Sequence, residues 1–196
     1  KNLIQQEFAE VKFSSGKTLT LEENFSLPGN KQMNISGSSG ILKTLGTISL
    51  AGNLSVSGDN STLEGGTVAL SGGTLQADND ITVKSDITSK SDSRISVATG
   101  KKITYTGNTL NIGTHSLTLS GAGSFENTSS LALDNSTSIL SLNGISKVKN
   151  ISVTGDLTSG KLEAAQDSKV DTLLLSGSSR IDIVNQKTLT LVNAVE

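Results

Sequence analysis

Two carboxylates and one lysine are the residues whose types and spacing come closest to a chemical site. Asp78 and Asp80 flank Asn79, and calcium prefers carboxylate and carbonyl oxygens, so these aspartates are the best candidates for a cation site. Lys102 follows Asp80 by 22 residues, and a repeat of that length would place it beside Asp80 on the next turn. A positioned acid and base could transfer protons. The alternative, which we favour, is that both aspartates shape a corner and the lysine balances their charge.

Other catalytic groups are scarce in this chain. His115 is the only histidine, so a Ser-His-Asp triad would have to use it, and its setting in Gly113-Thr114-His115-Ser116 indicates a surface corner. The absence of cysteine excludes disulfides, thiolate metal sites and cysteine nucleophiles. We therefore expect no catalytic residue, no cofactor and no enzymatic activity, and no metal site unless Asp78 and Asp80 form one.

Composition argues against two classes of partner. The 196 residues carry a net charge of −2, and Lys101-Lys102 is the only basic doublet, so the chain lacks the electrostatic footprint of a nucleic-acid-binding protein. No apolar run approaches the ~20 residues needed to cross a bilayer, so we expect no membrane span in this segment. Aromatic residues make up 3% of the chain and tryptophan is absent, which indicates a narrow core of aliphatic side chains.

The elements that would position these residues are short strands. An apolar-x-apolar triplet recurs along the chain, usually with serine or threonine in the middle, and glycine, asparagine and serine fill the gaps. Alternation with a period of two predicts strands in which the two apolar side chains point inward. The clearest triplets are 19–21, 48–50, 54–56, 81–83, 95–97, 117–119 and 189–191.

The triplets align at a period of about 20–22 residues in three sets, offset from one another by about seven residues. The first set is Leu19, Ile41, Leu63, Ile81, Ile103, Phe125 and Ile145; the second is Leu54, Leu75, Ile95, Leu117 and Ile139; the third is Leu110, Leu131, Ile151 and Leu173, with partner positions Ile112, Leu133, Val153 and Leu175. A period of this size indicates a repeat architecture. We therefore predict an all-β fold, a three-sided parallel β-helix, right-handed as parallel crossovers usually are.

The repeat predicts a single domain over residues 1–196, with two segments that fit it poorly. The sequence predicts an irregular entry segment over residues 1–15, and a loop insertion or a short helical turn over residues 157–172. The strand pattern persists to the last residues, whereas solenoids usually carry polar caps. We therefore expect this segment to belong to a longer repeat protein.

Several phrases of the sequence resemble those of a known group of proteins. Gly16-Lys17-Thr18-Leu19-Thr20-Leu21, Gly100-Lys101-Lys102-Ile103-Thr104-Tyr105, His115-Ser116-Leu117-Thr118-Leu119-Ser120-Gly121 and Gln186-Lys187-Thr188-Leu189-Thr190-Leu191 resemble the β-helical repeats of large bacterial cell-surface proteins. These are autotransporter passengers and filamentous-haemagglutinin-type adhesins. The resemblance implies the fold and an extracellular or cell-surface location, and it implies no particular ligand or site residue.

From these observations we expect a non-enzymatic structural or adhesive stalk segment of a bacterial surface or secreted fibrous protein. Its expected partners are host-surface or matrix glycans or proteins, or neighbouring copies in a fibre, and not nucleic acid. The alternative is a carbohydrate-active β-helix module of the polysaccharide-lyase or phage tail-spike type, since some lyases of this fold place an acid and a base on adjacent turns, as Asp80 and Lys102 would be.

An ice-binding solenoid is a less favoured alternative, because ice binding suits a continuous array of outward threonines. The outward positions predicted for the first set are Thr20, Leu42, Glu64, Thr82, Thr104 and Glu126, and those of the third set are Asn111, Ala132, Ser152 and Leu174. Charged or apolar residues interrupt both rows. The serines and threonines are better explained as soluble residues that strands accommodate well.

Overall fold

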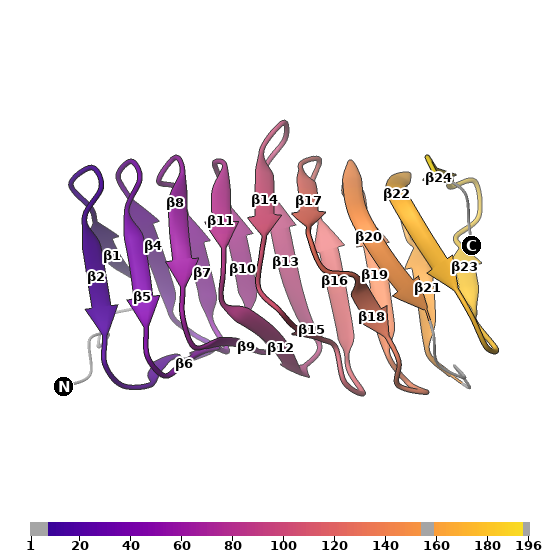
Figure 1. Ribbon diagram of the computed structural model, residues 1–196, viewed down its shortest axis with the longest axis horizontal. Coiled ribbons are helices and arrows are strands. Elements are labelled where there is room, and N and C mark those ends of the chain that lie inside the picture. The colour runs from indigo at the N-terminus through magenta and orange to yellow at the C-terminus, as the bar shows by residue number, and fades with distance from the viewer. Residues whose placement is uncertain (1–7, 154–158, 194–196) are drawn as a thin grey trace.

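Short strands and tight corners wind the chain into a parallel β-helix of about eight turns (Figure 1). The computed structural model of the chain describes residues 8–153 and 159–193. All strand pairs within these ranges are parallel, so each strand bonds to its equivalent on the turns before and after. The described part of the chain contains no helix long and apolar enough to cross a membrane.

Three faces, which we call A, B and C, run along the axis. Face A is a nine-stranded sheet formed by β1 (Phe8–Lys12), β4 (Gln32–Ser36), β7 (Asn53–Val56), β10 (Thr74–Ala77), β13 (Ser93–Val97), β16 (Ser116–Ser120), β19 (Ile139–Asn143), β21 (Lys161–Ala164) and β23 (Ile181–Ile183). Face B contains β2 (Thr18–Leu21), β5 (Ile41–Thr44), β8 (Ser61–Glu64), β11 (Ile81–Val83), β14 (Lys102–Tyr105), β17 (Ser124–Asn127) and β24 (Leu189–Leu191). Face C contains β3 (Phe25–Leu27), β6 (Thr47–Leu50), β9 (Thr67–Ser71), β12 (Asp86–Ser91), β15 (Leu110–Asn111) and β18 (Leu131–Leu133).

Faces B and C become one sheet near the C-terminal end of the described chain. Two long strands, β20 (Lys147–Val153) and β22 (Ser168–Leu175), start on face B and continue onto face C without a break. The strands of face B descend at the front of Figure 1, those of face A rise behind them, and successive turns advance from left to right. That path is a right-handed coil, as the parallel-crossover preference predicts.

The core is a narrow column filled from all three faces. Alternate residues of each strand point inward, so that β7 and β10 alternate half-buried and buried positions along their length. The largest buried side chains are those of Tyr105 and Phe125 on neighbouring turns, and their rings stack with centroids 5.8 Å apart. Aliphatic side chains fill the remaining column, as the low aromatic content predicts.

The alignment of the third set is confirmed by the strand register. Leu131 lies opposite Ile151, which lies opposite Leu173, and the partner positions Leu133 and Val153 pair in the same way. On the turn before Leu131, Asn111 lies opposite Ala132, so the predicted register also holds at that step.

The alignment of the first set is wrong at several steps. Leu19 lies opposite Leu42, so Leu42 is buried and not outward as predicted. The partner of Ile81 is Ser61, whereas Leu63 lies opposite Val83. The physical reason is that Ser61 is buried and occupies an inward position, which an alignment based on apolar residues passes over. At the end of the set, Phe125 lies opposite Val148 and not Ile145.

The second set is correct over Leu54, Leu75 and Ile95, is off by two residues at Leu117, and is off by one at Ile139, since Leu117 lies opposite Leu140. Ile95 lies opposite Leu119, while Leu117 lies opposite Ser93. Ser93 is buried, so a polar residue again takes an inward position.

Two segments predicted to be irregular contain regular strands. Within residues 1–15, β1 pairs with β4 over five residues, and residues 1–7 lie outside the described residues. Within residues 157–172, β21 pairs with β19 and the first half of β22 pairs with β20, while residues 157–158 lie outside the described ranges. Short alternating phrases such as Lys161-Leu162-Glu163-Ala164 are therefore sufficient to continue the coil.

Tyr105 makes the stability of the fold depend on alkaline pH. Burial of the phenol, with a further contribution from the nearby Asp86 carboxylate, raises the pKa of Tyr105 to about 12 from its ordinary 10.0. The hydroxyl donates a hydrogen bond to the backbone carbonyl of Thr109. Because the folded pKa lies above the unfolded one, the stabilisation is fully present below about pH 10 and is lost as the pH rises towards about 12.

We expect the wild-type protein to lose about 2–3 kcal/mol of stability across that interval and a Tyr105→Phe variant to lose less. Tyr105 is the only tyrosine and the chain has no tryptophan, so the phenolate absorbance reports this one residue. Spectrophotometric titration of the folded protein checks the pKa, and denaturant unfolding at several alkaline pH values checks the stability. An ordinary tyrosine titration in the folded protein would contradict this account of the core.

Candidate functional site

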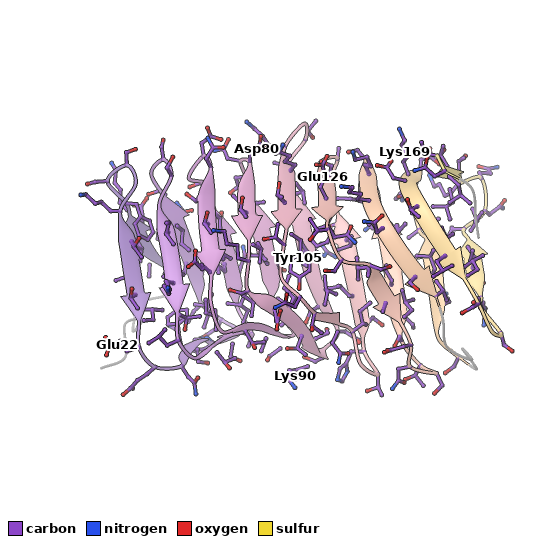
Figure 2. The ribbon with its side chains drawn as sticks, viewed as in Figure 1. Glu22, Asp80, Lys90, Tyr105, Glu126 and Lys169 are labelled. Carbon is purple, nitrogen blue, oxygen red and sulfur yellow. The ribbon has the colours of Figure 1, made fainter. Side chains whose placement is uncertain are left out.

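Asp78 and Asp80 lie at the corner between faces A and B, but each is tied to a different face. The carboxylate of Asp78 accepts hydrogen bonds from Ser55 Oγ at 2.5 Å and from Gln76 Nε2 at 2.7 Å, both on face A. Asp80 Oδ1 accepts the backbone N–H of Lys102 on face B at 3.0 Å. Figure 2 shows Asp80 at the upper edge of the rod. The corner geometry of these two residues is thus that of aspartates that join neighbouring turns.

The predicted proximity of Asp80 and Lys102 is confirmed by the register, since the next residues, Ile81 and Ile103, lie opposite each other. The contact involves the backbone amide of Lys102, so the arrangement joins two turns and does not pair a carboxylate with an ammonium group. Among the described residues, no group of three or more His, Cys, Asp or Glu side chains could hold a metal ion.

Three aspartates spaced six residues apart hold one turn to the next at all three corners. Asp80 begins the series between faces A and B. Asp86, at the start of β12 on face C, accepts the backbone N–H groups of Asn108 and Thr109 through Oδ1 at 2.9 and 3.1 Å. Asp92, before β13 on face A, accepts the N–H of Ser116 through Oδ1 at 2.8 Å. Each carboxylate therefore satisfies amides that the corner leaves without a strand partner.

The sequence carries a signal for this device that the search for catalytic groups missed. Asp80-Ile81-Thr82-Val83-Lys84-Ser85 is followed by Asp86-Ile87-Thr88-Ser89-Lys90-Ser91 and then by Asp92. Each six-residue unit forms one side of a turn of the β-helix, so the aspartates fall at successive corners. The same type of bond occurs elsewhere, since Asn24 Oδ1 accepts the N–H of Thr47 and Asp167 Oδ1 accepts that of Thr188.

Asp86→Ala is expected to destabilise the protein by about 1–2 kcal/mol, because two corner amides lose their acceptor. Asp86→Asn keeps a side-chain oxygen and should lose less. The alanine variant should also lower the pKa of Tyr105, since the Asp86 charge contributes to raising it. Denaturant unfolding and tyrosine titration check both effects. Asp134, an exposed residue after β18, gives the control Asp134→Ala, and equal losses in the two alanine variants would contradict the proposed corner role.

Face B carries two short ladders of alternating charge. Glu64 lies between Lys43 and Lys84, at 3.5 and 3.4 Å, and its hydrogen bond and charge interaction with Lys84 lower the pKa of its carboxyl. Lys147 pairs with Glu126 at 3.0 Å and with Asp171 at 3.5 Å, and the hydrogen bond with Glu126 raises its pKa. These side chains are partly exposed, and such surface pairs contribute little to stability because solvent screens them.

The predicted outward row of face B is correct from Thr82 through Thr104 to Glu126 and wrong before Thr82. Thr62, Thr82 and Thr104 lie opposite one another on consecutive turns, and the row continues into Ile41 on one side and Glu126 on the other. Thr20 lies in the neighbouring row with Lys43 and Glu64. The face-C row Asn111, Ala132, Ser152 and Leu174 is confirmed. The longest of these threonine runs therefore spans three turns.

His115 lies in the corner between β15 and β16 and is half-buried. Its backbone N–H donates to the carbonyl of Ile112 at 3.3 Å, and its carbonyl accepts the N–H of Ile139 at 3.1 Å. The predicted corner setting of the histidine is confirmed.

On the surface formed by residues 8–153 and 159–193, hollows large enough to hold a small ligand include the following two. One, of about 600 Å³, lies where β20 and β22 pass from face B to face C, and Thr128, Asn150, Thr172 and Leu174 line part of it. The other, of about 320 Å³, lies in the middle of the rod at the junction of faces C and A, beside Asp92 and Arg94. The sequence offered no prediction for either hollow.

No model of a known protein family, no curated protein and no solved structure matches the chain significantly. The fold and the local geometry therefore carry the functional argument.

Proposed function

We propose that this chain is a non-enzymatic structural and adhesive segment of a bacterial surface or secreted fibrous protein, and that it works outside the cell. The observation that supports this role is the unbroken pairing of nine strands along face A, together with a continuous apolar column beneath them. Eight steps of ~4.8 Å between those strands give a rod about 38 Å long. Such a rod can hold an attached binding region at a distance from a surface.

The outer surface favours contact over a wide area and not a deep reaction centre. The outward residues of face A between β4 and β19 are mostly serine, threonine, asparagine and glutamine, which can exchange hydrogen bonds with hydrated partners. Host-surface or matrix glycans, host proteins, or neighbouring copies in a fibre are the partners we propose.

The carbohydrate-cleaving alternative rests on Asp80 and Lys102, and their geometry favours the structural role. A general acid or base needs a carboxyl group that reaches the reacting bond, whereas Asp80 Oδ1 is bonded to a backbone amide of the next turn. The ice-binding alternative is disfavoured by the short threonine run on face B.

A screen against neutral and acidic polysaccharides tests this proposal. We expect neither the wild-type protein nor the Asp80→Ala variant to cleave any polysaccharide. The variant should be less stable, because the Lys102 amide loses its acceptor. Robust cleavage that disappears in a folded Asp80→Ala variant would overturn the structural role. Asp78→Ala, at the same corner but tied to face A, controls for general effects of removing a carboxylate there.

A further inference from the structure

The smaller hollow in the middle of the rod has the features of a ligand site. It occupies about 320 Å³ between the end of β9 and the outer surfaces of β10, β13 and β16. Its lining includes Gly72, Gly73, Thr74, Asp92, Arg94 and Thr118. Ligand pockets usually begin at about this volume and hold a few polar groups that fix orientation.

Arg94 is the one cationic residue in the lining of the hollow. It is the only charged residue in the strands of face A from β4 to β19. Its neighbours on the adjacent strands are Thr74 and Thr118, and none of the ion pairs found among the described residues involves it. The other arginine, Arg180, is instead bonded to both carboxylate oxygens of Asp182, at 3.0 and 2.9 Å.

Asp92, which also lines the hollow, presents an acceptor that is already held in place. Asp92 Oδ1 accepts the N–H of Ser116 at 2.8 Å, and a carboxylate has about four lone-pair sites, so the side chain can accept further hydrogen bonds. Ser93 Oγ donates to the carbonyl of Ser91 at 2.8 Å and accepts the N–H of Gly72 at 3.0 Å. The floor of the hollow is thus fixed by its own hydrogen bonds.

We propose that this hollow binds a carboxylate-bearing saccharide. The planar guanidinium of Arg94 suits a carboxylate with two parallel hydrogen bonds, and Asp92 accepts hydrogen bonds from sugar hydroxyl groups. The hydroxyls of Thr74 and Thr118 supply further donors and acceptors beside the arginine. A densely anionic ligand is disfavoured because Asp92 repels a second negative charge.

An acidic peptide fits the hollow less well than a saccharide. A saccharide offers hydroxyl groups that can bond to Asp92, whereas an acidic peptide offers mainly carboxylates, which the Asp92 charge repels. This inference deepens the adhesive part of the proposed function by naming a ligand class. The inference rests on the adhesive part alone, because the structural role of the β-helix does not depend on this site.

The test uses a short oligomer of galacturonic acid as the probe and calorimetric titration as the measurement. We expect the wild-type protein to bind the oligomer and its neutral methyl ester to bind at least tenfold more weakly. Arg94→Gln should weaken binding of the acid to a similar extent, and Arg94→Lys should restore only part of it. Arg180→Gln removes the same charge about four turns away and should bind as the wild type does.

Three outcomes would overturn the site. They are no binding of the acid to the wild-type protein, equal binding of the acid and its ester, and equal weakening by Arg94→Gln and Arg180→Gln. Tighter binding of an oligoglutamate peptide that depends on Arg94 would replace the saccharide with an acidic peptide. None of these results involves cleavage, so failure of the site is distinguishable from failure of the structural role.

Discussion

Gly121→Ala is expected to destabilise the protein by about 2–5 kcal/mol, because it adds both backbone strain and a steric clash at a corner. Gly121 follows β16 and has φ of +87°, which residues with a side chain rarely adopt. A Cβ atom there would lie 2.1 Å from the carbonyl oxygen of Val97 on the preceding turn. The clash is with backbone, so it cannot be relieved by rotating a side chain.

Gly100 provides a matched control for Gly121→Ala. It also has positive φ, +70°, but an added Cβ would meet nothing within 4 Å. Gly100→Ala should therefore cost only the backbone strain, about 1–2 kcal/mol. Unfolding by urea, followed by circular dichroism, measures both variants. Equal shifts of the two midpoints would show that the turns do not approach as closely as the fold requires.

Phe125→Ala is expected to destabilise the protein by about 3–5 kcal/mol, because it leaves a cavity in the core column. Phe125 is fully buried and stacks on Tyr105. The variant should also change the fluorescence of Tyr105, the only tyrosine in the chain. The same unfolding experiment measures the stability.

Phe8→Ala on face A is the control for Phe125→Ala, since Phe8 is 54% exposed. Its loss should be within about 0.5 kcal/mol, as is usual for surface positions. A loss for Phe125→Ala no greater than that for Phe8→Ala would mean that Phe125 does not lie in the core.

The fold class could be predicted from the sequence because each strand is short, alternates strictly and repeats at nearly constant spacing. The third set of positions was placed in correct register since its inward residues, such as Leu131, Ile151 and Leu173, are all large and apolar. The right-handed winding of the β-helix could be predicted because connections between parallel strands are usually right-handed.

Register failed at two steps because polar residues point inward, and at Leu19 because Ile41 was aligned in place of the adjacent Leu42. Ser61 and Ser93 are buried and stack on Ile81 and Leu117, and Asn127 is buried opposite Tyr105. Asn127 is tolerated in the column because its amide bonds to the backbone carbonyls of Ser129 and Asn150, both at 2.6 Å. Such compensation depends on neighbours one turn away, which a pattern of apolar residues does not reveal.

The candidate site around Arg94 shows the same limit. The predicted pairing of Leu75 with Ile95 already places Thr74 beside Arg94. The predicted pairing of Ile95 with Leu117 would have placed Ser116 on the other side, whereas the true register places Thr118 there. The hollow itself arises from the path of the corner at Gly72-Gly73, which spacing alone does not specify.

The adjacency of Asp80 and Lys102 could be predicted from a spacing of 22 residues, but the atoms in contact could not. Whether a carboxylate meets an ammonium group or a backbone amide depends on where the strand begins. Here β14 begins at Lys102, so its amide points along the axis towards Asp80 on the turn before.

A distance measurement between two spin labels tests the central claim, a straight rod of strands in register. The chain has no cysteine, so Gln32→Cys and Glu163→Cys give two unique labelling sites. Six register steps separate them, through Asn53, Thr74, Arg94, Thr118 and Ser141. At ~4.8 Å for each step the backbone positions lie about 29 Å apart.

The pair Asn53→Cys and Glu163→Cys is one step shorter, so the label linkers cancel when the two distances are compared. Pulsed electron paramagnetic resonance should give two narrow distributions that differ by about 4.8 Å. Broad distributions, or two pairs whose distances do not differ by one strand spacing, would contradict the rod.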